Sequence, residues 1–164
     1  MGSLPGTGQA SLVHRMVLPL AAQAPGMARD KTREVLGWLG LGHLAEDATL
    51  LVSELVSNAV RHTAGSSPSL ELRIAMAEAR LRIEVLDCDP RPPQPRTPGP
   101  LGESGRGFLL VEALADDWGV SQTETGKSVW IELRTGAGAG PAAQYHWSET
   151  RISAQTPTPA AQPR

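Results

Sequence analysis

The chain has 164 residues, enough for one domain with a hydrophobic core and short flanking segments. Its 15 Lys and Arg residues nearly balance 17 Asp and Glu residues, and the lack of a basic stripe with interleaved aromatic residues argues against a nucleic-acid-binding protein. A single cysteine, Cys88, excludes an intrachain disulfide and fits a reducing, cytoplasmic compartment, and no apolar run reaches the ~20 residues of a membrane span.

The N-terminal residues 1–15 are rich in Gly, Ser, Pro and Thr, so we expect a disordered leader. Met16–Leu20 is expected to be a first strand, with Pro19 at a sheet edge, where a missing N–H matters least. Residues 14–24 also loosely resemble a short signal peptide. Because the apolar run is short and Pro19 interrupts it, we favour the strand.

A first helix is expected next. Pro25 suits the first turn of a helix, and the helical pattern of Met27–Leu39 stops at Gly40, which we expect to be a C-terminal cap.

The second helix, about Leu44–His62, carries the densest polar pattern of the chain. At about 100° per residue, its apolar side chains form one core-facing stripe, made up of Ala48, Leu51, Val52, Leu55 and Ala59. Glu54, Asn58 and His62 follow each other at spacings of four on the shoulder of that stripe. Polar groups on a half-buried shoulder can line a pocket without being stranded in the core. The alternative is three polar residues at a solvent boundary.

Two runs with β character, Leu70–Met76 and Arg80–Asp87, are expected to form an antiparallel hairpin. Asp87 falls on the buried side at the strand end, where a carboxylate is costly without a partner. It could also simply start a turn. Residues 89–104 contain six prolines and two glycines, which is typical of a lid or a flexible insertion.

The sequence Gly105-Arg106-Gly107 leads into a third amphipathic helix, expected over Phe108–Asp117. Two further strands follow, Trp118–Val120 and Ser128–Leu133. The expected fold class is therefore α+β: a two-layer sandwich with three helices on one face of a mostly antiparallel sheet.

The domain that results spans residues 16–135, and residues 136–164 are expected to be a flexible tail, since they return to Ala, Gly, Pro and Thr.

Four separated motifs occur in a familiar order. Glu54–His62, the strand-end Asp87, Gly105–Val111 and Gly126–Trp130 resemble the N box and the successive glycine boxes of the GHKL, or histidine-kinase-like, ATPase superfamily. Within it, the chain resembles the small anti-sigma-factor serine/threonine kinases of high-GC bacteria. The resemblance covers about Met16–Leu133 and implies the Bergerat-type form of the sandwich.

This resemblance implies a site for ATP and Mg²⁺. Asn58 would hold Mg²⁺ through its carbonyl oxygen, a hard ligand of the kind this ion prefers. Glu54 would be the general base for an attacking hydroxyl, or else a structural group. Asp87 would accept a hydrogen bond from the adenine amino group. His62 would either orient Asn58 or cap the helix.

The same resemblance assigns the phosphate end. Gly105 and Gly107 would let backbone N–H groups close on phosphate oxygens at a helix N-terminus. Arg106 would reach a phosphate or face solvent. Ser128 would touch the nucleotide or be an outward-facing strand residue. Residues 89–104 correspond to the family's lid over the triphosphate.

The expected function is that of a cytoplasmic ATP-binding regulator that phosphorylates a serine of an antagonist protein and controls a sigma factor. Its partners would be the sigma factor, the antagonist or both, without nucleic acid or membrane, and a homodimer stays open. One alternative is a non-catalytic, ATP-dependent protein-binding module. Another is a protein with a decayed pocket that serves only in docking.

Overall fold

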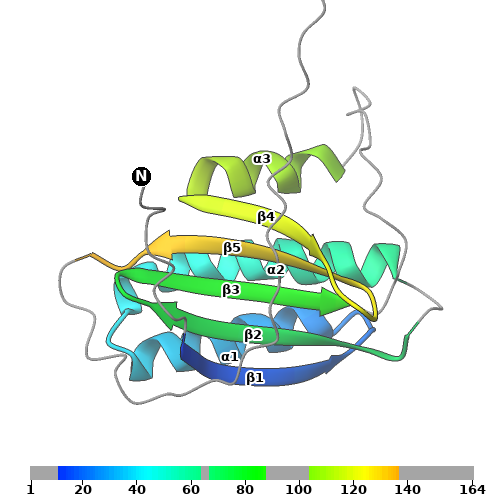
Figure 1. Cartoon of the computed structure of the whole chain (residues 1–164), viewed down its shortest axis with the longest axis horizontal. Helices are drawn as coiled ribbons and strands as arrows, with labels where there is room; N and C mark the ends of the chain where they lie inside the picture. Colours follow the sequence, from blue (N-terminus) through cyan, green and yellow to red (C-terminus); the bar gives the residue numbers. More distant parts are fainter. Residues whose placement is uncertain (1–10, 64–66, 88–103, 137–164) are drawn as a thin grey trace, which may run out of the picture.

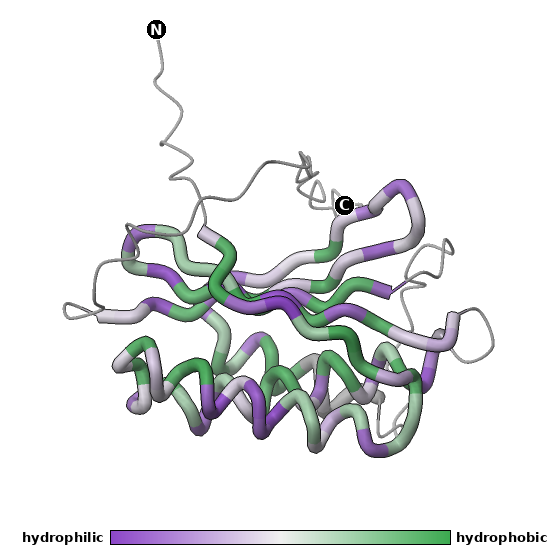
Figure 2. Tube along the Cα trace, turned by 90° about the horizontal axis from the view of Figure 1, so that it is seen from below, coloured by the Kyte–Doolittle hydropathy of each residue, from purple (hydrophilic) through white to green (hydrophobic). Residues whose placement is uncertain are grey.

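The structure is a computed structural model, which describes residues 11–63, 67–87 and 104–136. Its strands lie in one layer and its helices in another (Figure 2). Residues 89–103 of the expected lid at 89–104, and the tail beyond residue 136, lie outside the described residues.

In the described residues, five strands and three α-helices make up the two layers (Figure 1). In chain order the elements are β1 (Ser11–Pro19), α1 (Ala24–Trp38), the short 3₁₀ helix η1 (Gly42–Leu44), α2 (Ala45–His62), β2 (Ser69–Ala77), β3 (Arg80–Asp87), α3 (Ser104–Leu114), β4 (Asp117–Gln122) and β5 (Lys127–Arg134). The strand order is β1-β2-β3-β5-β4, and every neighbouring pair is antiparallel. The predicted α+β sandwich is confirmed. None of the described helices is long and apolar enough to cross a membrane.

The first strand is longer than predicted. β1 begins at Ser11 and not at Met16, so residues 11–15 belong to the sheet and the predicted leader boundary is wrong. β1 pairs with the nine-residue β2 along its whole length. The neighbouring strand therefore supplies hydrogen-bond partners beyond the apolar run that sequence patterns detect. Pro19 ends this edge strand, as predicted.

The two long helices agree with the sequence pattern. All five residues of the predicted α2 stripe are buried in the core against the sheet. α1 ends in a Schellman motif: Gly40 has a φ of 70°, and the Leu41 N–H donates to the Leu36 carbonyl at 2.8 Å. A left-handed backbone costs glycine little, which explains why the helix stops there.

The third helix is displaced from its predicted range. α3 begins before Phe108, so Gly105 and Gly107 lie in its first turn and not ahead of it. It also ends before Asp117, which starts β4 instead because β4 pairs with β5 from that residue onward. The remaining elements agree with their predicted ranges to within a few residues.

The sheet face away from the helices carries charged side chains that pair with one another. Arg15 on β1 donates to Glu71 on β2 at 2.6 Å, and Arg73 also donates to Glu71. Burial raises the pKa of the Glu71 carboxyl, but the hydrogen bonds and charges of the two arginines outweigh it and leave that pKa below its ordinary value.

We expect the substitution Glu71→Gln to lower the free energy of unfolding at neutral pH by up to about 1 kcal/mol, the upper end for ion pairs that water screens. A carboxyl whose pKa is depressed in the folded state stabilises the fold at pH values above its unfolded-state pKa. This stabilisation is lost as the pH falls through the folded-state pKa. Urea unfolding of both proteins from pH 7 into the acid range tests this. A difference that does not shrink toward acid pH would contradict it.

Candidate functional site

The helix-facing side of the sheet forms an apolar floor that ends in a polar edge. Across β3, β5 and β4, one cross-strand row consists of Val85, Val129 and Val120. The next row consists of Asp87, Lys127 and Gln122. Consecutive residues on one face of a strand are about 7 Å apart. A flat ring resting on the valine row would therefore present its edge to the row that holds Asp87.

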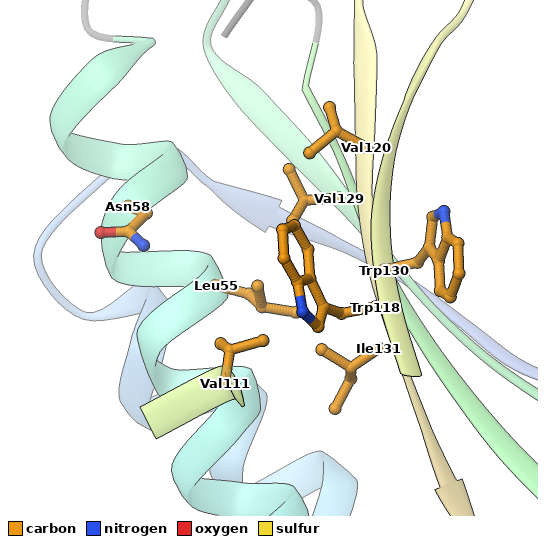
Figure 3. Close-up of a pocket in the computed structure, with 8 residues that line it drawn as sticks. All are labelled: Leu55, Asn58, Val111, Trp118, Val120, Val129, Trp130 and Ile131. Atoms are coloured by element: carbon orange, nitrogen blue, oxygen red, sulfur yellow. The ribbon is translucent and has the colours of Figure 1, made fainter. Parts of the chain in front are cut away.

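A cavity of about 100 Å³ lies over this floor, beneath α2 and α3 (Figure 3). Its lining residues are Leu55, Asn58, Val111, Trp118, Val120, Val129, Trp130 and Ile131. Figure 3 shows Asn58 on α2 and the Trp118 indole from β4 on opposite sides of the space, with Trp130 beyond the strands. Small-molecule sites usually measure roughly 300–1,000 Å³, so this cavity accounts for one part of a ligand.

The structure brings Glu54, Asn58 and Gly107 together where α3 contacts α2. A Cβ atom built on Gly107 would overlap Glu54 Oε2 and would lie 3.9 Å from Asn58 Nδ2. Only glycine leaves room for the Glu54 carboxylate in this position. Gly107 lies in the first turn of α3, where the helix dipole and free N–H groups favour an anion. The backbone of Gly105 and Arg106 belongs to the same turn, and the Arg106 side chain lies outside the described part of the chain.

Asn58 is half buried and has a neighbour that the sequence pattern did not reveal. Arg61 Nη2 donates to Asn58 Oδ1 at 3.2 Å, while Arg61 Nε donates to the Ser57 carbonyl at 3.3 Å. Residues three apart on a helix are neighbours, which is the signal that could have identified Arg61. The guanidinium thus contacts the oxygen that a metal ion would require. His62, the last residue of α2, is exposed.

Asp87 lies on the buried side of β3, as predicted, with 3% of its side chain exposed. Lys127 Nζ lies 3.5 Å from Asp87 Oδ2, and only 12% of the lysine side chain is exposed. Lys127 belongs to this site although its sequence motif did not single it out. The alternation along β5 that turns Val129, Ile131 and Leu133 inward also turns Lys127 inward. This alternation is the sequence signal that could have identified Lys127.

The structure does not bring Ser128 to this side of the sheet. Ser128 is fully buried on the opposite face, where its hydroxyl donates to Glu84 Oε1. Successive residues of a strand point to opposite faces, so Ser128 cannot share the face of Lys127. The strand interpretation of this serine agrees with that position, and its contact with a nucleotide stays a prediction. Arg82, on the same face, lies 4.0 Å from the centre of the Trp130 ring.

Comparison with known proteins places the chain among nucleotide-binding domains. A family model of the histidine kinase-like ATPase domain matches residues 18–133. An uncharacterized protein of Streptomyces coelicolor is 34% identical over 84 residues, which cover 49% of this chain and 79% of that protein. The serine-protein kinase RsbW of Oceanobacillus iheyensis is 30% identical over 117 residues, which cover 62% of this chain and 74% of that kinase.

Among solved structures, the RsbU and RsbW domains of a Mycobacterium tuberculosis protein match with a TM-score of 0.58 and 23% sequence identity. The match covers 74% of this chain and 31% of the mycobacterial chain. At this level of identity the likeness is one of fold.

We expect Ser128→Ala to destabilise the fold by about 1–3 kcal/mol, because it leaves the buried Glu84 carboxylate without this donor. Urea unfolding of Ser128→Ala, Glu84→Gln and the double variant checks the assignment. A shared hydrogen bond makes the two effects non-additive. Additive effects would show that the two side chains do not act as a pair.

Proposed function

The chain belongs to the histidine kinase-like ATPase family, and from this premise we propose that it binds ATP with Mg²⁺ and transfers the γ-phosphoryl group to a serine of a protein partner. The observation that carries the proposal is the convergence of Glu54, Asn58 and Gly107 at the contact of α2 with α3. Val120 and Val129 line the cavity there, and the next cross-strand row of the sheet holds Asp87.

The base would occupy the sheet end of the site. Val120 and Val129, which line the cavity, offer an apolar surface for a purine ring, and Asp87 offers an acceptor for the amino group at position 6 of adenine. Because Asp87 is almost completely buried, its hydrogen bonds are formed away from competing water. This makes it the residue that distinguishes the base.

The triphosphate would lie at the helix end. The N-terminal turn of α3 offers phosphate oxygens its backbone N–H groups and the positive end of the helix dipole, while the space beside Gly107 holds the Glu54 carboxylate. Asn58 fits a metal ion that arrives with the phosphates, because it contributes one neutral oxygen at the cavity wall and Mg²⁺ takes its other ligands from phosphate and water. When bound, Mg²⁺ neutralises charge that develops on the transferred phosphoryl group.

Glu54 is the proposed general base. Its carboxylate lies against Gly107 and is half buried, which leaves it accessible to a hydroxyl that enters beside the phosphates. The serine oxygen forms a bond to the γ-phosphorus, the bond to the β,γ-bridging oxygen breaks, and the serine proton passes to Glu54. ADP leaves with the electron pair of the broken bond.

The proposed partner is a protein that presents a serine. The kinase RsbW, which covers 62% of this chain at 30% identity, is named a serine-protein kinase, and this supports serine as the acceptor. We further propose that this acceptor is an antagonist protein, that the chain controls a sigma factor, and that it acts in the cytoplasm.

A second candidate function is an ATP-dependent protein-binding module without phosphoryl transfer. Arg61 favours it, because its guanidinium contacts Asn58 Oδ1, the atom that would bind Mg²⁺. If Arg61 keeps this contact when ATP is bound, Asn58 would not hold Mg²⁺ in the position that phosphoryl transfer requires.

We expect wild-type protein to bind ATP, and Asn58→Ala to weaken Mg²⁺-dependent binding by about tenfold or more. Isothermal titration with ATP, with and without Mg²⁺, measures this. With γ-labelled ATP and a serine-containing protein co-purified from the native host, Glu54→Gln should reduce label transfer by 100-fold or more, in the range for a general base. Glu46→Gln, an exposed acid on the same helix, is the control.

No ATP binding by the wild type would overturn both candidates. ATP binding without label transfer, together with indifference to Glu54→Gln, would favour the binding module.

We expect Gly107→Ala to impair label transfer while leaving the fold intact, because the new methyl group displaces the far end of the flexible Glu54 side chain. Alanine in a helix is about 1 kcal/mol more favourable than glycine, so thermal stability should not fall much. Gly37→Ala in α1 is the matched control, since a Cβ there meets nothing within 4 Å. Equal transfer rates in both variants would show that the Glu54 position is unimportant.

A further inference from the structure

We propose that Lys127 contacts the nucleobase, and that Lys127 and Asp87 together form a donor and acceptor pair that reads the edge of a purine. This inference rests on the proposed ATP site and assigns the specificity of its base end. It starts from the one ion pair that lies on the helix-facing side at the end of the apolar floor, within the part of the chain that the structure describes.

The position of Lys127 is unusual for a lysine. As the first residue of β5 it pairs with Asp87, the last residue of β3, and its ammonium lies 3.5 Å from the carboxylate. The two side chains are 12% and 3% exposed, so both charges have lost most of their water. Lysine and aspartate are almost never buried to this extent unless paired, and pairs of this kind give little net stability. A contribution to the stability of the fold therefore does not by itself account for this buried ion pair.

The chemistry of the pair matches one edge of adenine. The amino group at position 6 is a donor and the neighbouring ring nitrogen N1 is an acceptor. Asp87 can accept from the amino group, while the Lys127 ammonium donates to N1. An ammonium has three N–H donors, so Lys127 can contact N1 and retain its contact with Asp87.

The same pair also fits a 6-oxopurine with the roles exchanged. The oxygen at position 6 accepts from Lys127, and the N1–H of guanine or hypoxanthine donates to Asp87. A carboxylate with a neutral neighbour would instead repel that oxygen. Lys127 is therefore expected to reduce the ratio of the affinity for ATP to the affinity for GTP.

The alternative is a positioning role in which Lys127 only holds Asp87. In that case loss of the lysine weakens binding of every nucleotide by the same factor. A direct contact to N1 weakens binding only of nucleotides that possess N1. The analogue 1-deaza-ATP, in which a C–H group replaces N1, separates the two roles.

The experiment measures dissociation constants for ATP, 1-deaza-ATP and GTP with wild type and Lys127→Met. We expect wild type to bind ATP about tenfold or more tightly than 1-deaza-ATP, as expected for a hydrogen bond from a charged donor. Lys127→Met should bind these two nucleotides with equal affinity, and its preference for ATP over GTP should increase. Lys31→Met is the matched control, because Lys31 lies on α1, pairs with Glu34, and is the chain's other lysine.

Equal ratios of ATP to 1-deaza-ATP affinity in wild type and Lys127→Met would overturn the inference and leave the proposed function intact. A failure of wild type to bind ATP would overturn the proposed function as well. If Lys127→Met does not fold, the wild-type comparison still decides, because a wild type that binds ATP and 1-deaza-ATP equally has no donor on N1. Protection of Lys127, but not of Lys31, from an amine-reactive reagent by ATP provides a second readout.

Discussion

The missing side chain at Gly107 is the constraint on which the site depends. It allows the first turn of α3 to rest against Glu54 and close to Asn58, so that two helices far apart in the chain meet at these polar side chains. The apolar stripe of α2 fixes the other side of this arrangement, since its burial against the sheet sets the direction in which the helix shoulder faces. A larger residue at 107 would separate the carboxylate from the helix end that it faces.

Much of this arrangement follows from periodicity in the sequence. The 3.6-residue pattern predicts α2, its buried stripe and the half-buried positions of Glu54 and Asn58, and the two-residue pattern predicts the buried position of Asp87. Such patterns depend only on each segment's own side chains, so they hold without knowledge of the neighbouring element. For the same reason they predict that Ser128 and Val129, as neighbours on one strand, point to opposite faces of the sheet.

Other features depend on which segments meet. β1 extends back to Ser11 because β2 is long enough to pair with it, and no local pattern carries this information. The contact of Lys127 with Asp87 requires the register between β3 and β5, which are adjacent in the sheet although α3 and β4 separate them in sequence. The contact of Arg61 with Asn58 is local, but only a helix-surface analysis that includes charged residues would reveal it.

The two ends of the proposed site therefore depend on different kinds of structure. At the proposed base end, Asp87 and Lys127 belong to hydrogen-bonded strands whose register admits no gradual adjustment, so the sheet would fix the base specificity. At the phosphate end, Asn58 and Glu54 project from α2 toward α3, and Arg61 already contacts the oxygen of Asn58. The guanidinium disfavours a cation at that oxygen, because like charges repel. An incoming triphosphate would attract the Arg61 guanidinium away from Asn58, so in the proposed site metal binding at Asn58 would depend on the triphosphate, and binding of the base would not.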